Sequence, residues 1–202
     1  MWRYLRRFDA AFVNGACAAK YARWLGFDKA RTYTGLISTN TRRFGAHVGG
    51  KGFLYVGRDA PEKGLDVLRE AHRRYREKGG RWPLEIVNGV SPDALGPIYS
   101  AADCFVLPSR HEPWGVVLVE AAAAGLPIIC TDACGARHEV VRGNGIVIPH
   151  GDVDALAAAM WRMGNGEWGT GNGELGRELA KPYSCESWAE RVVAISKELC
   201  NA

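Results

Sequence analysis

The chain has 202 residues, of which 47% are hydrophobic and 24% charged, a composition typical of a globular domain. It contains no apolar run near the roughly 20 residues that a membrane span requires, and its N-terminus lacks the apolar stretch of a signal peptide, so a cytoplasmic location is expected. The net charge of +4 is unevenly spread: residues 1–81 hold 18 Lys and Arg against 7 Asp and Glu, whereas residues 82–202 hold 8 against 15.

The basic first part of the chain has two interpretations. Its surplus of Lys and Arg suits an anionic partner such as a phosphate, an acidic lipid headgroup or a nucleic acid, or it belongs to the solvated faces of ordinary helices. The N-terminal segment adds apolar side chains at Trp2, Tyr4, Leu5 and Phe8 to its arginines. A basic amphipathic helix of this kind either contacts an anionic membrane surface or packs on the domain.

The predicted elements alternate regularly from residue 52 onward. Before that point, residues 1–45 are mixed, with a strand-like AAFVN segment, a helix near 16–25 and the segment TYTGLISTN. Short apolar runs predict strands at 52–57, 84–88, 104–108, 127–131 and 145–149. Amphipathic or capped segments predict helices at 64–78, 93–102, 116–124, 152–163 and 187–199. The Gly-rich stretch 164–176 is predicted to be a mobile loop.

This alternation predicts the fold class. The strands are short and apolar on both faces, as in a parallel sheet that helices cover on both sides. We therefore expect an α/β protein with a single Rossmann-like, doubly wound parallel sheet and a short N-terminal remnant. Ligands of such sheets bind at the carboxyl ends of the strands. Arg58 and Glu112 both follow strand ends, so both are expected at that edge.

Two glutamates eight positions apart flank the start of the helix 116–124. Pro113 and Gly115 place Glu112 in the loop before the helix, whereas Glu120 lies about one turn inside it. The backbone N–H groups of Gly115, Val116 and Val117 open the helix between them, and such groups form an anion site together with the helix dipole. This hydroxyl–phosphate–hydroxyl layout suits a nucleotide sugar, with its ribose, diphosphate and hexose.

Cations for the diphosphate follow the first strand of the series. Arg58 and Lys63 lie in the segment GRDAPEKG, and a leaving diphosphate requires neutralisation by a metal or by fixed cations. We find no acidic metal-binding cluster, so fixed cations and no metal are expected. Glu62 either orients Lys63 or is simply exposed.

The six cysteines show no metal-binding spacing. No pair is separated by two residues and no histidine cluster accompanies them, which argues against zinc. Cys104 and Cys130 fall inside apolar runs that read as strands. Buried, reduced thiols are expected at both positions.

Several of these motifs occur in one family in the same order. The segments FLYVGRDAPEKGLDVLREA and YSAADCFVLPSRHEPWGVVLVEAAAAGLPIICTDACGARHE resemble retaining glycosyltransferases of the GT-B fold, in the group that carries an E-x7-E motif. The resemblance is dense over residues 52–160. It implies an N-terminal-domain remnant and linker at 1–48, a donor-binding domain at 49–183 and a C-terminal crossover helix at 184–202.

The resemblance also implies roles for single residues. Arg58 and Lys63 would hold the donor diphosphate, Glu112 would contact the hydroxyls of the donor sugar and Glu120 those of the ribose. Further donor contacts would come from Gly57, Trp114, Gly115, Val116 and Val117. The implied reaction transfers a sugar from a nucleotide sugar to a glycan or lipid-linked acceptor with retention, without a metal or other cofactor. Nucleic acid is not an implied partner, whereas a peripheral membrane contact is.

The chain departs from the family pattern at three places. The acceptor-binding domain is nearly absent, and one strand–helix unit is missing between the strands 52–57 and 104–108. Ala136 stands where many members have Gly, and Asn40 where Asp is common. The alternatives are therefore an active glycosyltransferase, a nucleotide-sugar-binding module without catalysis, and a truncated remnant that needs a partner chain to supply an acceptor domain.

Overall fold

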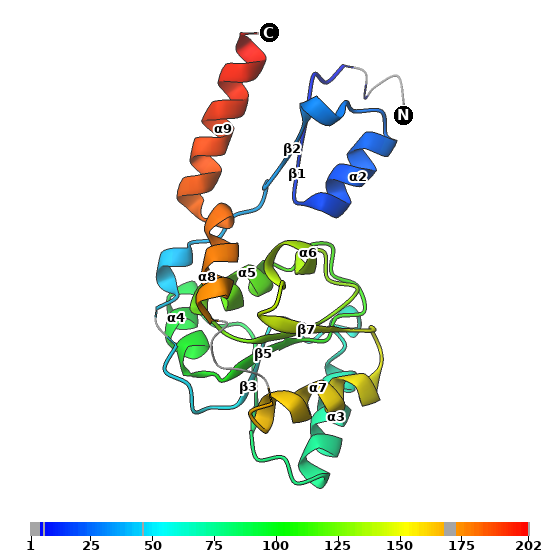
Figure 1. Ribbon diagram of the computed structural model, residues 1–202, viewed down its shortest axis with the longest axis vertical. Coiled ribbons are helices and arrows are strands. Elements are labelled where there is room, and N and C mark those ends of the chain that lie inside the picture. The colour runs from blue at the N-terminus through cyan, green and yellow to red at the C-terminus, as the bar shows by residue number, and fades with distance from the viewer. Residues whose placement is uncertain (1–4, 6, 46, 168–172, 202) are drawn as a thin grey trace. The chain divides into compact units, whose positions relative to one another are not determined.

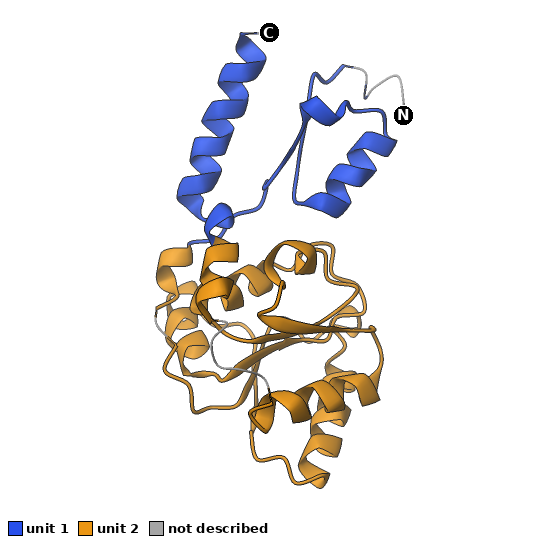
Figure 2. Ribbon diagram, viewed as in Figure 1, with its two compact units in different colours: residues 1–40, 181–202 blue, residues 41–180 orange. Residues whose placement is uncertain are grey.

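A computed structural model describes residues 5, 7–45, 47–167 and 173–201 (Figure 1). The chain divides into two compact units (Figure 2). Unit 1 comprises residues 1–40 and 181–202, and unit 2 comprises residues 41–180. Each unit is described by itself below.

Unit 2 is built on a five-stranded parallel sheet. Its strands are β3 (Phe53–Val56), β4 (Leu84–Val87), β5 (Cys104–Leu107), β6 (Ile128–Thr131) and β7 (Gly145–Ile148). They lie in the order β4-β3-β5-β6-β7. Every residue of the three central strands is buried, whereas the edge strands β4 and β7 are partly exposed. This confirms the predicted parallel sheet, because continuous apolar runs without alternation are stable only where helices cover both faces.

Helices cover both faces of this sheet (Figure 1). One face carries α3 (Leu65–Glu77) and α7 (Val153–Gly164), which pack on each other. The opposite face carries α4 (Pro92–Ala101), α5 (Val116–Ala124), α6 (Arg137–Val140) and α8 (Gly173–Ala180). The α/β, doubly wound fold is therefore confirmed, with a single strand–helix unit between β3 and β5.

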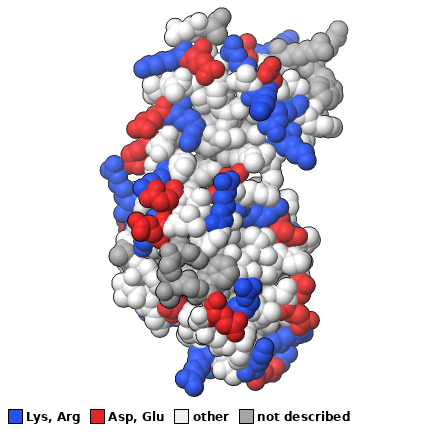
Figure 3. Space-filling model, viewed as in Figure 1, with Lys and Arg blue, Asp and Glu red and all other residues white. Residues whose placement is uncertain are grey.

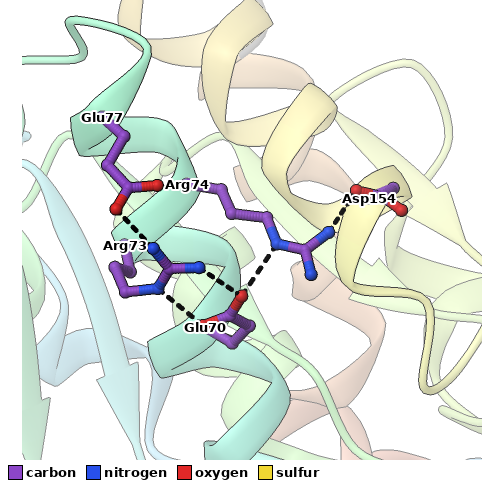
Figure 4. A network of polar contacts seen from close by, with 5 residues as sticks. All are labelled: Glu70, Arg73, Arg74, Glu77 and Asp154. Atoms are coloured by element: carbon purple, nitrogen blue, oxygen red, sulfur yellow. Dashed lines mark hydrogen bonds and ion pairs between the residues drawn. The ribbon is translucent and has the colours of Figure 1, made fainter.

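An ionic network joins α3 to α7 at the surface (Figure 4). Arg74 donates from Nε to Glu70 at 2.8 Å and from a terminal nitrogen to Asp154 at 2.5 Å. Arg73 pairs with Glu70 and Glu77 on the same helix. Asp152 begins α7, because its carboxylate accepts the N–H of Ala155 at 2.9 Å, as predicted for a helix cap.

The strand order reverses between β3 and β5. The chain leaves β3 through α3 to reach β4 on one side, and then returns through α4 to β5 on the other side of β3. The connections after β3 and β5 therefore diverge at the carboxyl edge of the sheet. Such a switch point opens a crevice in which ligands of doubly wound sheets bind.

Unit 1 contains one β-α-β segment and the last helix. Strand β1 (Ala11–Val13) pairs in parallel with β2 (Thr32–Thr34), and α2 (Ala16–Trp24) connects them. The helix α9 (Cys185–Cys200) is tied to the segment after β2. Trp188 donates its indole N–H to the carbonyl of Leu36 at 2.8 Å. The strand and helix predicted within 10–25 are thus confirmed.

The structure differs from the sequence analysis at one predicted loop and at one helix that was not predicted. The stretch 164–176 was expected to be one loop, but Gly173 already begins α8. Glycine suits the start of this helix because a Cβ at Gly173 would lie 2.8 Å from the carbonyl oxygen of Gly125, which follows α5, and a Cβ at Gly176 would lie 3.1 Å from that of Ala122. Residues 168–172 lie outside the described part of the chain. The short helix α6 was not predicted at all.

The predicted membrane contact rests partly on residues outside the described part of the chain, namely Trp2 and Tyr4. Leu5 and Phe8 are described, and Phe8 is about half exposed. Among the described residues, none of the helices has the length and apolar character needed to cross a bilayer.

Candidate functional site

The turn after β3 brings the backbone close to a tyrosine. Tyr55 donates its hydroxyl to the carbonyl of Arg58 at 2.8 Å, which fixes the path of the turn. A side chain at Gly57 would place its Cβ 2.6 Å from that hydroxyl oxygen, so the turn requires glycine. Burial raises the pKa of Tyr55 to about 12, and its hydroxyl therefore stays a donor at neutral pH.

The cationic turn continues into the 3-10 helix η3 (Pro61–Lys63) and Gly64. Gly64 has φ of +67°, a conformation that residues with a side chain rarely adopt. A Cβ there would also lie 2.4 Å from the carbonyl oxygen of Pro108, which ends β5. Gly64 thus lets the turn that carries Lys63 rest against the loop after β5.

An ion pair connects these two segments. The Nζ atom of Lys63 lies 2.5 Å from Oε2 of Glu112, although the residues are 49 positions apart. The two side chains are only 17% and 11% exposed. Taking charges out of water is costly, and mutual pairing is what offsets that cost here. The sequence analysis named both residues but did not predict that they pair.

The loop that carries Glu112 is held from its other side by the segment after β6. Gly135 donates its N–H to the carbonyl of Glu112 at 2.9 Å, and Ala136 donates to that of Trp114 at 2.8 Å. The loop then enters α5 through Gly115, which has φ of +91°. The N–H of Leu118 donates to the carbonyl of Gly115 at 2.9 Å, whereas the N–H groups of Val116 and Val117 precede the first helical hydrogen bond, as at every helix start.

These segments line a cavity of about 210 Å³ at the switch point. Seven of the nine predicted site residues border it, namely Gly57, Arg58, Lys63, Glu112, Gly115, Val116 and Val117. The remaining lining residues are Tyr55, Val56 and Leu107, which the sequence analysis missed as ligand contacts. They could have been predicted from their position near the carboxyl ends of β3 and β5, because residues at strand ends border the crevice in such folds.

Arg58 differs from Lys63 in its exposure. Its side chain is 76% exposed, and its guanidinium lies 3.4 Å from the carboxylate of Glu62. A contact this long and exposed contributes little, so the guanidinium is held only loosely at the cavity rim. Glu62 was expected either to orient Lys63 or simply to be exposed. Its carboxylate instead contacts the guanidinium of Arg58.

Two predicted donor contacts lie outside the cavity lining. Trp114 is buried below the loop, with 5% of its surface exposed. Glu120 is buried in α5, where Tyr99 donates its hydroxyl to Oε2 of the carboxylate at 3.0 Å. Burial and the carboxylate together raise the pKa of Tyr99 well above its ordinary value, so the phenol remains a donor.

Within the described residues, no three His, Cys, Asp or Glu side chains come together as metal ligands. An Asp-x-Asp sequence does occur at 152–154, but Asp152 caps α7 and Asp154 pairs with Arg74. Cys104 and Cys130 are buried as predicted, and Cys134 is buried beside them. Burial raises the pKa of the Cys104 thiol, which keeps it protonated.

Charges of both signs are interspersed over the face of the molecule drawn in Figure 3. A second hollow, of about 260 Å³, lies within unit 1 and includes Asp28 and Arg31. The carboxylate of Asp28 already accepts the N–H of Ala30 at 2.8 Å as a cap. At the switch-point cavity, by contrast, Arg58, Lys63, Glu112 and the start of α5 converge.

The chain is similar to known proteins in sequence and in structure. Residues 83–167 match the family model described as Glycosyl transferases group 1. An uncharacterized glycosyltransferase of Methanocaldococcus jannaschii is 27% identical over 187 residues, which cover 77% of this chain and 47% of that protein. The sucrose-phosphate synthase of Thermosynechococcus elongatus has a similar structure, with a TM-score of 0.78, 26% identity and coverage of 99% of this chain and 60% of that one.

A third likeness is to the fold alone. The pneumococcal O-GlcNAc transferase, solved in complex with UDP and GlcNAc, is 16% identical and gives a TM-score of 0.73 over all of this chain and 47% of its own. The chain spans less than half the length of the curated relatives it matches. The matched family model shows a group 1 glycosyltransferase domain over residues 83–167, and the five-stranded sheet has the fold of the C-terminal half of GT-B structures.

Proposed function

We propose that the cavity between the ends of β3 and β5 binds a nucleotide sugar, and that the protein transfers the sugar to a glycan or lipid-linked acceptor with retention. One observation carries the proposal. Arg58, Lys63, Glu112 and the start of α5 border a single cavity at the switch point of the sheet. Cations, an anion-binding helix start and a hydroxyl-binding carboxylate are the groups that such a donor requires.

The diphosphate is proposed to lie between Lys63, Arg58 and the first turn of α5. Charge develops on the leaving diphosphate as the sugar departs, and preorganised cations stabilise that charge. Val116 and Val117 contribute backbone N–H groups, which need no side-chain rearrangement. The proposal includes no metal and no further cofactor, since these fixed groups supply the positive charge.

The sugar is proposed to contact Glu112, whose carboxylate accepts hydrogen bonds from hydroxyl groups. When a phosphate pairs with Lys63, Glu112 loses its ion-pair partner and accepts hydrogen bonds from sugar hydroxyls instead. Glu120 is proposed for the ribose hydroxyls, with its carboxylate held in α5 by a hydrogen bond from the Tyr99 hydroxyl. The UDP and GlcNAc in the structure of the pneumococcal relative support the choice of ligand class.

The acceptor and its binding partner are part of the same proposal. We propose that a partner chain supplies an acceptor domain, and that a lipid-linked acceptor would bring the protein to the cytoplasmic face of a membrane. Sedimentation with vesicles tests the membrane contact: binding that rises with the fraction of anionic lipid supports it, and binding that is absent at every composition contradicts it.

Calorimetric titration with UDP and GDP tests donor binding. Lys63→Ala is expected to weaken binding at least about tenfold, because a hydrogen bond to a charged group contributes about 1.5–3 kcal/mol. Lys51→Ala is the matched control, since Lys51 is exposed and lies outside the cavity lining. If neither nucleotide binds the unaltered protein, the proposed function is wrong.

Turnover separates the two candidate functions that the sequence left open. Release of free nucleotide from UDP- or GDP-sugars, with candidate acceptors and partner chains added, would support transfer. Binding of the donor without any turnover would favour a nucleotide-sugar-binding module. The observation behind this second candidate is that the residues bordering the cavity are all proposed contacts of the donor and none is a proposed contact of the acceptor.

A further inference from the structure

One arginine connects the two segments that carry the Lys63–Glu112 pair. Arg110 lies two residues before Glu112, and its guanidinium reaches the opposite segment. It donates to the carbonyl of Pro61 at 3.0 Å and makes a two-pronged contact with Asp66, at 2.7 and 2.5 Å. Pro61 and Asp66 stand on either side of Lys63 in the sequence. A single side chain thus spans the whole cationic turn.

The backbone reinforces this connection. The N–H of Arg110 donates to the carbonyl of Glu62 at 2.8 Å, and that of His111 donates to the same oxygen at 3.3 Å. The carbonyl belongs to the residue next to Lys63. We call this set of contacts the Arg110 clasp. It comprises the hydrogen bonds from the Arg110 side chain to Pro61 and Asp66, and those from the backbone N–H groups of Arg110 and His111 to the carbonyl of Glu62.

The clasp is outside the cavity and mostly in solvent. Neither Arg110 nor Asp66 borders the cavity, and their side chains are 38% and 69% exposed. An exposed ion pair contributes little to global stability. Its two-pronged geometry nevertheless fixes direction as well as distance, which a single contact does not. Its effect is therefore expected in the local geometry of the two segments more than in the stability of the fold.

We infer that Arg110 and Asp66 are positioning residues, which hold the Lys63 turn and the Glu112 loop at the separation that lets both side chains meet one ligand. The inference rests on the proposed donor site. Without the clasp, Lys63 and Glu112 still attract each other, but the turn and the loop sample a wider range of separations. A ligand must then restrict that motion when it binds, which lowers its affinity.

Amide hydrogen exchange tests the clasp without any ligand. Asp66→Asn is expected to speed exchange of the Arg110 and His111 amides about fivefold, which corresponds to the loss of about 1 kcal/mol from an exposed pair. Asp154→Asn is the matched control, because Asp154 also pairs with an arginine of another element, far from the Lys63 turn in sequence. Equal exchange in both variants would overturn the inference.

Titration with UDP tests the consequence for binding. Arg110→Gln removes the two-pronged contact and is expected to weaken UDP binding about fivefold, whereas Arg74→Gln, which breaks the α3–α7 pair, is expected to leave it unchanged. Arg110→Lys keeps the charge but not the fork, so it should restore part of the affinity. Equal UDP affinity in Arg110→Gln and Arg74→Gln would contradict positioning.

The two experiments distinguish the inference from the proposed function. If the unaltered protein does not bind UDP or GDP, the proposed donor site fails, and the exchange rates alone decide whether the clasp orders the loop. If the unaltered protein binds UDP and the clasp variants bind equally well, the donor site stands and the positioning role is wrong.

Discussion

At the scale of single residues, the central feature is that Lys63 and Glu112 neutralise each other in the ligand-free protein. Both residues were predicted from the sequence as donor contacts, with the lysine on phosphate and the glutamate on sugar. Their direct contact at 2.5 Å was not predicted, since nothing in the chain reports a pairing across 49 residues. The cavity is therefore less positive than a count of its cations suggests.

This pairing makes a prediction about Glu112→Gln. A diphosphate without a sugar must displace the carboxylate from Lys63 and then lie near a buried negative charge. Removing that charge is expected to tighten the binding of UDP about fivefold, or about 1 kcal/mol, while it slows sugar transfer. Calorimetric titration measures the change, with Glu77→Gln on the exposed end of α3 as the control. Weaker UDP binding by Glu112→Gln would contradict the competition.

At the scale of elements, two glycines allow the cost of a left-handed backbone to be distinguished from the cost of a steric clash, because their backbone conformations are similar and their surroundings differ. Gly64 has φ of +67° and faces the carbonyl of Pro108, whereas Gly89 has φ of +70° and nothing within 4 Å of its Cβ direction. Gly89→Ala is expected to cost about 1 kcal/mol of unfolding free energy, the penalty of a left-handed residue. Gly64→Ala should cost at least about 2 kcal/mol more, because η3 must move away from β5.

Urea unfolding monitored by circular dichroism measures both costs. The same variants, titrated with UDP, relate the cost to the site: Gly64→Ala is expected to weaken binding and Gly89→Ala to leave it unchanged. Equal destabilisation by the two substitutions would show that η3 does not depend on its close approach to Pro108.

The contact between the Glu112 loop and α3 also has a predictable pH dependence. Hydrogen bonds from Arg110 lower the pKa of Asp66 from 3.8 to about 2. A carboxyl whose pKa is lowered in the folded state stabilises that state above its unfolded pKa, and the contribution is lost as the pH falls through the folded value. The difference in amide exchange between the unaltered protein and Asp66→Asn should therefore persist at pH 6 and disappear between about pH 4 and pH 2. A difference that survives at pH 2 would contradict this assignment.

The sequence predicted the long, apolar elements well and the short or glycine-rich ones poorly. The central strands and α5 are apolar throughout, so their burial follows directly from composition. The helix α6 has only four residues, too few to show a period. Gly173 and Gly176 read as loop residues by propensity, but α8 needs them for its approach to α5, a tertiary reason that no local pattern contains. The orientation of Glu120 toward Tyr99 is equally invisible before the chain is folded.

At the scale of the whole molecule, the core is concentrated in unit 2. The large, fully buried side chains include Tyr55, Tyr75, Tyr99, Leu156 and Met160, which all belong to unit 2. The cysteines follow the same division: Cys104, Cys130 and Cys134 are buried, whereas Cys17, Cys185 and Cys200 are exposed. The thiols of unit 2 are thus shielded from solvent, whereas those of unit 1 are accessible to it.

Thiol labelling tests this division. A maleimide reagent added to the native protein is expected to modify Cys17, Cys185 and Cys200 rapidly and the three buried cysteines only after unfolding. Mass spectrometry of the digested protein identifies the labelled positions, with a sample in denaturant as the reference for complete reaction. Rapid native labelling of Cys134 would show that the loop behind Glu112 opens readily.

The Lys63–Glu112 pair has one more consequence, for the choice of ligand. A phosphate without a sugar pairs with Lys63 and leaves Glu112 without its ion-pair partner. A free sugar that replaces Lys63 as the partner of Glu112 leaves the lysine unpaired. In either case one charge is left buried without a partner, which costs several kcal/mol, on the order of 3–5. Only a molecule that presents an anion and hydroxyl groups together satisfies both side chains at once. A nucleotide sugar is therefore expected to bind more tightly than UDP, which satisfies only the lysine of this pair, and more tightly than the free sugar.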